Sequence, residues 1–323
     1  MERDSKRKSL RLSRLRPIRL LFAVAVVGAC GISPSFRHGS GFPSALGIRP
    51  SYGPPTISAV PNLAAASPLL WMPGLDEGWD PQGLAAIDGS VFVSAYQSDR
   101  FGVNRGHCRV FRIDPATGHE MGHLDVPLPC GHAGGLAHAG NGKLYIADTH
   151  TLFEVDLEEA FASPAPAFRI FPLGPGLKGA LAASGQREIW LGTYEEDRPG
   201  RIFRFDQAVL EAQPNGAPLT QSLASASLEI PTYAQGAGAS DGRLWISRSE
   251  IGWGSLEQLD LASGTITQRY AAPGGIEGIA FDAGGRLWAV SEAGALHFPS
   301  HYPFFPVIFR LDLSRMTPSS SDN

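Results

Sequence analysis

Two charged side chains, Lys178 and Glu277, occupy matching places in a repeated sequence pattern and could work together in acid–base chemistry. Each directly precedes a glycine near the start of a short apolar segment, in Leu177-Lys178-Gly179 and Ile276-Glu277-Gly278. A lysine and a glutamate that converge in a confined space shift each other's pKa values, which suits them to exchange protons with a substrate. The same residues could instead form a structural ion pair, and both interpretations remain open.

Familiar catalytic motifs do not occur in the sequence. It contains no Gly-x-Ser-x-Gly elbow for a nucleophile, no Gly-rich phosphate-binding loop, no His-Glu-x-x-His zinc motif and no dinucleotide fingerprint. Any chemistry therefore has to come from residues that separate elements of the fold bring together.

Five similar segments follow one another along the chain. Each opens with small residues and a glycine, namely Gly83, Gly135, Gly179, Gly236 and Gly278. A second apolar stretch follows, with an aromatic residue 9 to 11 positions beyond the glycine: Phe92, Tyr145, Trp190, Trp245 and Trp288. A third stretch alternates apolar and polar residues, as half-buried strands do. It ends in an aspartate that we expect to cap a turn: Asp114, Asp156, Asp206, Asp260 and Asp312.

Strands repeated in this way every 42 to 57 residues predict an all-β protein, a β-propeller with five four-stranded blades. Six blades are the alternative, if a degenerate blade lies in 31–68 or 179–236. The fifth copy lacks a fourth strand, and a matching strand around Pro68–Gly74 precedes the first copy. We therefore expect this N-terminal strand to complete the last blade and close the ring, which removes two exposed sheet edges.

The repeat also predicts which residues share a face. The first strands begin at the face where the second strands end, here called the top face, and the longest loops on it belong to blades one and five. Their aromatic, histidine and charged residues suit contact with an organic ligand or a partner. The alternative is that the two loops only pack together at the closure. The predicted ligand-binding residues are Gln82, Tyr96, His132, Asp148, Tyr194, Gln235, Arg248, Glu292, His297 and His301.

Two of the three cysteines, Cys108 and Cys130, bracket the third and fourth strands of blade one. Both ends of this antiparallel hairpin lie at the top face, so the two side chains should meet. In an exported protein such a pair predicts a disulfide. A metal site that combines His107 and Cys108 with Cys130 and His132 is the alternative.

The chain resembles a known family at its blade motifs. Gly134–Ala137 followed by Lys143–Thr149, and Glu277–Asp282 followed by Gly285–Val290, are similar to the SMP-30/gluconolactonase and strictosidine-synthase-like propellers and the related NHL repeats. The resemblance covers about residues 69–313. It implies the architecture rather than one activity, since such blades occur in lactonases, lyases, synthases and binding proteins.

The lactonase branch of that family carries a divalent metal in its central channel. The resemblance places the ligands directly before the glycines of the first strands, where this chain has Gln82, Gly134, Lys178, Gln235 and Glu277. Only Glu277 matches, and a hard cation needs several oxygen ligands. We therefore expect no cofactor, and a divalent metal such as calcium is the alternative.

The N-terminus reads as an export signal. Eight basic residues precede an apolar run over Leu20–Ala29 that is too short to span a membrane. The run ends in Val27-Gly28-Ala29-Cys30, which is similar to a bacterial lipobox, so both lipidation of Cys30 and plain secretion remain open. The expected parts are a signal peptide over 1–30, a Pro/Gly/Ser-rich spacer over 31–68, the propeller over 69–315 and a disordered tail over 316–323.

The net charge of the chain after the N-terminal segment excludes one class of partner. Residues beyond position 29 carry 19 basic and 29 acidic groups, a net charge of −10. Such a domain is a poor partner for nucleic acid. We expect an exported monomer, attached to the outer side of the cytoplasmic membrane only through a lipid if at all. Two hypotheses remain: a top face that binds a small organic ligand or a protein partner, or a hydrolase or lyase that uses Glu277 and Lys178.

Overall fold

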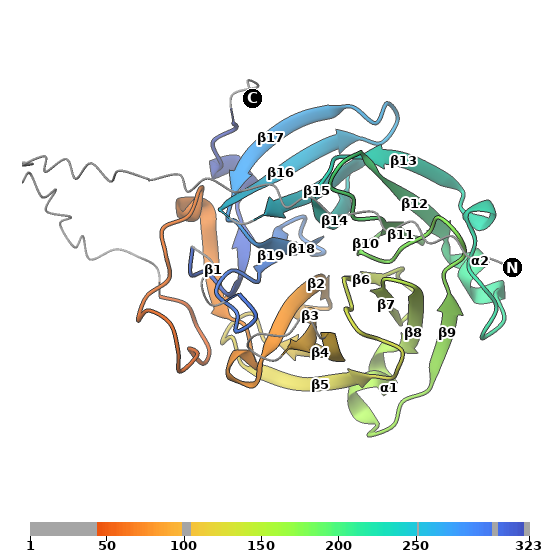
Figure 1. The fold of residues 1–323 in the computed structure, drawn as a ribbon, viewed down its shortest axis with the longest axis horizontal. Helices are drawn as coiled ribbons and strands as arrows, with labels where there is room; N and C mark the ends of the chain where they lie inside the picture. Colours follow the sequence, from red (N-terminus) through yellow and green to blue (C-terminus); the bar gives the residue numbers. More distant parts are fainter. Residues whose placement is uncertain (1–43, 99–104, 251, 299–302, 320–323) are drawn as a thin grey trace, which may run out of the picture. The chain divides into compact units, whose positions relative to one another are not determined.

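The computed structural model describes residues 44–98, 105–250, 252–298 and 303–319. Its strands form five antiparallel sheets of four strands each, arranged as blades around a common axis (Figure 1). The prediction of a five-bladed propeller is confirmed, and the six-bladed alternative is wrong. No helix among the described residues has the length and apolar character needed to cross a membrane.

The first three blades follow the chain in order. Blade one consists of β2 (Trp79–Ile87), β3 (Ser90–Ser98), β4 (Arg105–Ile113) and β5 (Glu120–Val126). Blade two consists of β6 (Gly135–His138), β7 (Lys143–Asp148), β8 (Thr151–Asp156) and β9 (Phe168–Pro172). Blade three consists of β10 (Leu181–Ser184), β11 (Glu188–Gly192), β12 (Gly200–Asp206) and β13 (Ala226–Ile230).

The last two blades complete the ring. Blade four consists of β14 (Ala234–Ser240), β15 (Arg243–Glu250), β16 (Trp253–Asp260) and β17 (Ile266–Ala272). Blade five consists of β18 (Ile276–Phe281), β19 (Leu287–Ser291), β20 (Val307–Leu311) and β1 (Ala66–Trp71). The helices are short: α1 (Leu157–Ala162), α2 (Gln207–Ala212), η1 (Leu63–Ala65), η2 (Leu75–Glu77), η3 (Gln221–Leu223) and η4 (Leu313–Arg315).

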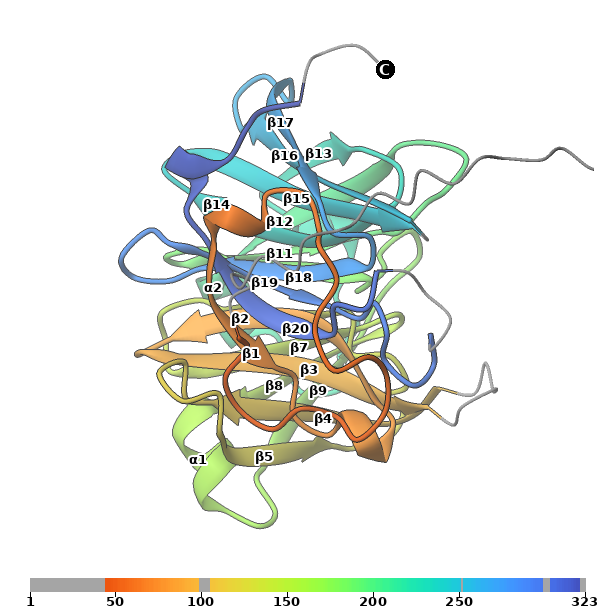
Figure 2. The ribbon, with the colours of Figure 1, turned by 90° about the vertical axis from the view of Figure 1, so that its left-hand side faces the viewer.

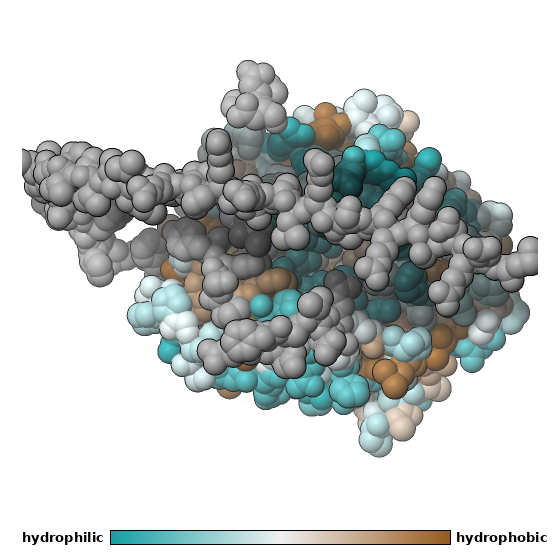
Figure 3. All heavy atoms as spheres, in the orientation of Figure 1, coloured by the Kyte–Doolittle hydropathy of each residue, from teal (hydrophilic) through white to brown (hydrophobic). Residues whose placement is uncertain are grey.

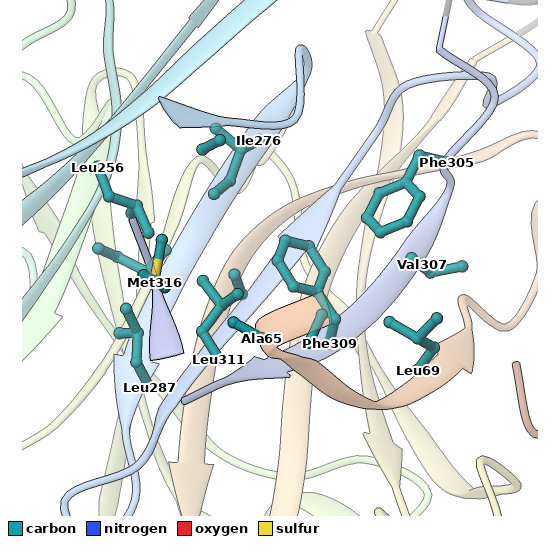
Figure 4. Packing of buried hydrophobic residues seen from close by; sticks show 14 of the residues in the cluster. Ala65, Leu69, Leu256, Ile276, Leu287, Phe305, Val307, Phe309, Leu311 and Met316 are labelled. Carbon is teal, nitrogen blue, oxygen red and sulfur yellow. The ribbon is translucent and has the colours of Figure 1, made fainter. Parts of the chain in front are cut away.

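The ring closes as the sequence predicts. β1 pairs antiparallel with β20, with Leu69 opposite Phe309 and Trp71 opposite Val307. Figure 2 shows the two strands side by side. The side chains of Leu69 and Phe309 pack with Phe305. Figure 4 shows these three side chains directed into one apolar cluster. Because the outer edge of β20 is covered by β1, the last blade has its full set of four strands.

The repeated aromatic residues hold neighbouring blades together. Phe92 and Tyr145 pack with residues of blades two and three, and the tryptophans of the other copies likewise face the next blade around the ring. Burying such a side chain contributes roughly 2–3 kcal/mol. On the face seen in Figure 3, the residues that are not grey are mostly hydrophilic, with hydrophobic ones scattered among them.

Glycine opens the first strands because their main chains touch around the axis. A Cβ atom on Gly83 would lie 2.6 Å from the main chain of Gly135 in the next blade. Real Cβ atoms do not come that close, so a side chain there would force the two strands apart.

Four of the five recurring aspartates cap turns as predicted, whereas Asp206 precedes α2 without a side-chain hydrogen bond to that helix. Asp114 accepts hydrogen bonds from the main chain of Ala116 and the hydroxyl of Thr117, and Asp156 caps the N-terminus of α1. These hydrogen bonds hold the pKa values of both carboxyl groups below their usual range.

Two segments outside the repeats differ from expectation. Residues 44–65, part of the predicted spacer, lie against blade five: Leu46 forms a parallel bridge with Leu70, and Ile57 is buried. At the other end Met316 is buried and the main chain of Ser319 donates to Arg269, where a disordered tail is predicted. Both segments lack a regular apolar period, so only their tertiary contacts reveal that they belong to the domain.

Candidate functional site

A pocket of about 360 Å³ opens at the top face, where the first strands of the blades begin around the axis. All five blades contribute to it. Its lining residues are Gln82, Tyr96, His132, Thr149, Lys178, Ala180, Tyr194, Glu196, Gln235, Glu277, Glu292 and Phe298. The structure thus brings together in this channel-mouth pocket both predicted catalytic residues and six of the ten predicted ligand-binding residues.

The register of the blades corrects the alignment of the third repeat. Ala183 pairs with Trp190 in the way that Ala137 pairs with Tyr145. Ala180, and not Lys178, therefore occupies the place that Gln82, Gly134, Gln235 and Glu277 hold in the other blades. The glycine of this copy, Gly179, stands two residues early, which is why glycine position alone gave the wrong register.

Lys178 and Glu277 lie in different electrostatic surroundings. The ammonium of Lys178 is 3.5 Å from a carboxylate oxygen of Glu195, and its side chain is 44% exposed. Arg198 approaches the other oxygen of Glu195, also at 3.5 Å. Glu277 is only 3% exposed. The half-exposed lysine thus forms an ion pair with Glu195, while Glu277 lies deeper in the channel.

Gln82 joins the first blade to the last. Its amide nitrogen donates to Glu292 at 3.0 Å and to the main-chain oxygen of Pro81 at 2.9 Å. These bonds fix both side chains on the wall of the pocket.

The end of β3 and the described start of the blade-five loop meet at the seam between the first and last blades. The ring of Tyr96 lies 5.6 Å from that of His132 and 6.2 Å from that of His297, centre to centre. Nδ1 of His297 is hydrogen-bonded to the hydroxyl of Ser98 at 2.7 Å. The end of β3 and His297 of the blade-five loop therefore pack against each other beside the pocket, whose wall includes Tyr96. His301, also predicted to bind ligand, lies outside the described residues.

Asp148 is directed away from the pocket. One of its oxygens accepts hydrogen bonds from the main-chain N–H groups of Gly131, His132 and Ala133, at 3.2, 2.7 and 3.0 Å. Ala133 has a φ of 51°, which an alanine adopts only when its surroundings hold it there. Asp148 thus positions His132 and does not itself line the pocket.

The predicted disulfide fastens the same turn. Cys108 and Cys130 are bonded, which confirms the pairing. The two sulfurs and the Asp148 carboxylate lie close enough together to suggest a metal site. Because the sulfurs are bonded to each other they are not thiolates, so this cluster does not fit a metal.

Arg248 has a structural role in place of the predicted ligand contact. Its guanidinium lies 2.5 Å from Glu257, a fully buried carboxylate that Arg269 also contacts at 2.8 Å. It further donates to the main-chain oxygen of Thr232 at 2.7 Å. Removing one partner of a buried ion pair costs more than an exposed pair contributes, so this position is constrained by folding.

The pocket is a poor site for the metal that the family resemblance implies. At the position before the first-strand glycine, blades one, four and five supply two side-chain amides and one carboxylate. The equivalent residues of blades two and three, Gly134 and Ala180, have no side-chain donor atom. A hard divalent cation takes six or more oxygen ligands, several of them charged.

A buried acid beneath the seam has no counterpart in the sequence predictions. Asp80, in β2, is fully buried, and neither of its oxygens forms a hydrogen bond within the described part of the chain. Burial raises its pKa to about 7, and the nearby main-chain N–H of His297 only partly opposes this rise. The hydroxyl of Tyr52, from the segment before β1, is buried near it, and burial followed by the charge of Asp80 raises the pKa of this phenol well above its usual value.

Comparisons with known proteins find similarity to solved structures at low sequence identity. No family model and no curated protein matches the chain. Among solved structures, glutaminyl cyclase from Myxococcus xanthus is similar at 13% identity and a TM-score of 0.48, covering 79% of this chain and 97% of that one. Regucalcin, a calcium-binding protein from Agrobacterium tumefaciens, is similar at 16% identity and a TM-score of 0.42, covering 73% and 92%. The class that the strand pairing defines is a β-propeller of five blades.

Proposed function

We propose that this protein binds a small polar organic molecule in the channel-mouth pocket. The observation that carries the proposal is the composition of that pocket: five blades direct carboxylate, amide, imidazole, ammonium and aromatic groups at one space of about 360 Å³. This volume is within the usual range for small-molecule sites, which combine apolar walls with a few placed polar groups.

The proposal includes export of the protein. The basic and apolar N-terminal segment up to Cys30 is the basis for it, and lipidation of Cys30 would tether the domain to the outer side of the membrane. The Cys108–Cys130 disulfide is compatible with an extracellular location, where such bonds persist. A tethered propeller with an open top face suits capture of a ligand from the surrounding medium.

An enzyme is the second candidate. Glu277 is nearly buried in the same pocket as the more exposed Lys178, so a carboxyl group and an ammonium group face one bound molecule. The resemblance to the SMP-30 and strictosidine-synthase-like propellers favours a hydrolase or lyase over other reactions. In either reaction one of the two groups would accept a proton and the other would donate one.

A ligand screen tests the proposal. Calorimetry with neutral polyols, organic amines and carboxylic acids should find at least one class that binds the wild-type protein and loses affinity in Glu277→Gln. The matched control is Glu229→Gln, on an exposed position of β13 outside the pocket. Equal affinities of the wild-type protein and Glu277→Gln for every ligand found, with no turnover lost in the variant, would refute the pocket as the site. Turnover that Glu277→Gln abolishes, with binding retained, would favour the enzyme.

A further inference from the structure

Three aromatic side chains continue the channel-mouth pocket outward over blades three and four. The ring of Tyr194, which lines the pocket, lies 6.3 Å from that of Tyr233 at an interplanar angle of 79°. The ring of Tyr233 lies 5.8 Å from that of Trp253 at 83°. Trp253 is 37% exposed. We call Tyr194, Tyr233 and Trp253 the aromatic ledge.

The backbone of Tyr233 is strained, and this strain suggests that the side chain has a role. Its φ is 59°, in the left-handed region that bulky residues avoid. The equivalent position in blade five is Gly275, with a φ of 72°, so a glycine meets the same backbone requirement without strain. Hydrogen bonds from Tyr233 to the oxygen of Glu195 and from Ser249 to the oxygen of Tyr233 hold the conformation. A tyrosine held in a conformation that glycine would adopt without strain points to a role for its side chain.

Negative charge surrounds the ledge. Glu196 accepts a hydrogen bond from the hydroxyl of Tyr194 at 3.2 Å, and Glu250 stands opposite Trp253 in the pairing of β15 with β16. Within the described residues neither glutamate forms an ion pair, whereas the nearby cations are taken: Lys178 and Arg198 pair with Glu195, and Arg248 pairs with Glu257. Burial first, and then the two glutamates, raise the pKa of Tyr194. The ledge thus combines aromatic rings with uncompensated carboxylates.

Aromatic rings next to carboxylates recognise organic cations. A cation is attracted to the negative face of a ring, most strongly that of tryptophan, and the attraction grows when water is excluded. The ring of Trp253 already has a cation on it, since the guanidinium of Arg248 lies 5.5 Å from its centre.

We propose that the aromatic ledge binds the cationic end of the ligand held in the channel-mouth pocket, so that the ligand is an organic ammonium compound. This inference rests on the proposed function for the pocket and adds the ligand class and a second contact surface. The polar remainder of the molecule would occupy the pocket among Gln82, Gln235 and Glu277, while its ammonium group lies over the ledge beside Glu196.

Choline and its neutral isostere 3,3-dimethyl-1-butanol test the inference. By calorimetry, choline should bind the full chain about tenfold more tightly than the isostere. Binding of choline should also change the tryptophan fluorescence, a change that Trp253→Leu should reduce. Equal affinity for the two probes, or no measurable binding of choline, would overturn the inference.

Tyr233→Gly tests the contribution of the Tyr233 ring to binding separately from any effect on folding. Because glycine relieves the backbone strain, this variant should melt at the wild-type temperature or above while binding choline about tenfold more weakly. Asp241→Gly is the matched control: it relieves a φ of 50° in the β14–β15 turn and should leave choline binding unchanged. Wild-type affinity in Tyr233→Gly would refute a role for the ledge. A third outcome separates the two proposals. If the wild-type protein prefers neutral ligands and Glu277→Gln binds none of them, the pocket proposal stands and the proposed role of the aromatic ledge is wrong.

Discussion

The amide of Gln82 donates a hydrogen bond to the carboxylate of Glu292 across the seam between the first and last blades, at 3.0 Å. These residues are far apart in the sequence, and only closure of the ring brings them together. The bond lies on the wall of the channel-mouth pocket, where it links closure of the fold to the shape of the candidate site.

Gln82→Leu should destabilise the protein and alter the pocket. The substitution leaves the partly buried Glu292 without this donor, and losing a hydrogen bond to a charged group costs about 1.5–3 kcal/mol. Urea unfolding measures the loss. Gln186→Leu, in an exposed turn, is the control and should stay within about 0.5 kcal/mol of wild type. Equal changes in the free energy of unfolding for the two substitutions would show that the Gln82–Glu292 hydrogen bond does not contribute to stability.

Asp80 should make stability fall as the pH rises from about 4 to about 7. Its pKa in the folded protein is about 7, well above the value of 3.8 expected when unfolded. Its contribution is complete below pH 4, where both states are protonated. Between pH 4 and pH 7 the unfolded state releases the proton while the folded state keeps it, which lowers stability by at most about 4 kcal/mol.

Asp80→Asn isolates this effect, because an amide cannot ionise. The free energy of unfolding, measured in urea from pH 4 to pH 8, should fall less steeply with pH in this variant than in the wild-type protein. The turn-capping aspartates, such as Asp114 and Asp260, act in the opposite direction. Their lowered pKa values add stability above about pH 4 that is lost in acid, and they are common to both proteins. Asp197→Asn, at an exposed site, should keep the wild-type slope, and parallel curves for wild type and Asp80→Asn would contradict the assignment.

The disulfide should be closed and stabilising. In a chain with Cys30 replaced by Ser, thiol labelling of the unreduced protein should modify neither Cys108 nor Cys130. Because the bond joins residues 22 positions apart, the paired substitution of both cysteines by Ser should cost about 3 kcal/mol in urea unfolding. Reductant should bring the parent chain to the stability of the variant. Labelling of both thiols without reductant would disprove the bond.

Asp148→Ala should release the turn that carries His132. Hydrogen exchange at the amides of Gly131, His132 and Ala133 should accelerate, since their shared acceptor is gone. Exchange in β16, in blade four, should stay unchanged and serves as an internal control. Ligand affinity should fall less than in Glu277→Gln, because Asp148 acts through His132 and does not line the pocket. Unaltered exchange at all three amides would contradict the positioning role.

The sequence by itself determined the architecture. Apolar alternation, Gly turns and one aromatic residue per repeat are local signals, so they predicted five blades, the closing strand before the first copy, and the Cys108–Cys130 pair at the ends of one hairpin. The first strands of four blades were also placed correctly around the axis, which is why Gln82, Gln235 and Glu277 were expected to meet.

Tertiary structure decided what each of these side chains does. It placed Ala180, and not Lys178, at the position equivalent to Gln82, Gln235 and Glu277, because strand pairing and not glycine spacing sets the register. It turned Asp148 toward a backbone turn and Arg248 toward buried Glu257, and it packed residues 44–65 onto blade five. In each case the partner comes from a distant part of the chain, and a hydrogen bond or ion pair depends on distances of a few ångströms that no local pattern encodes.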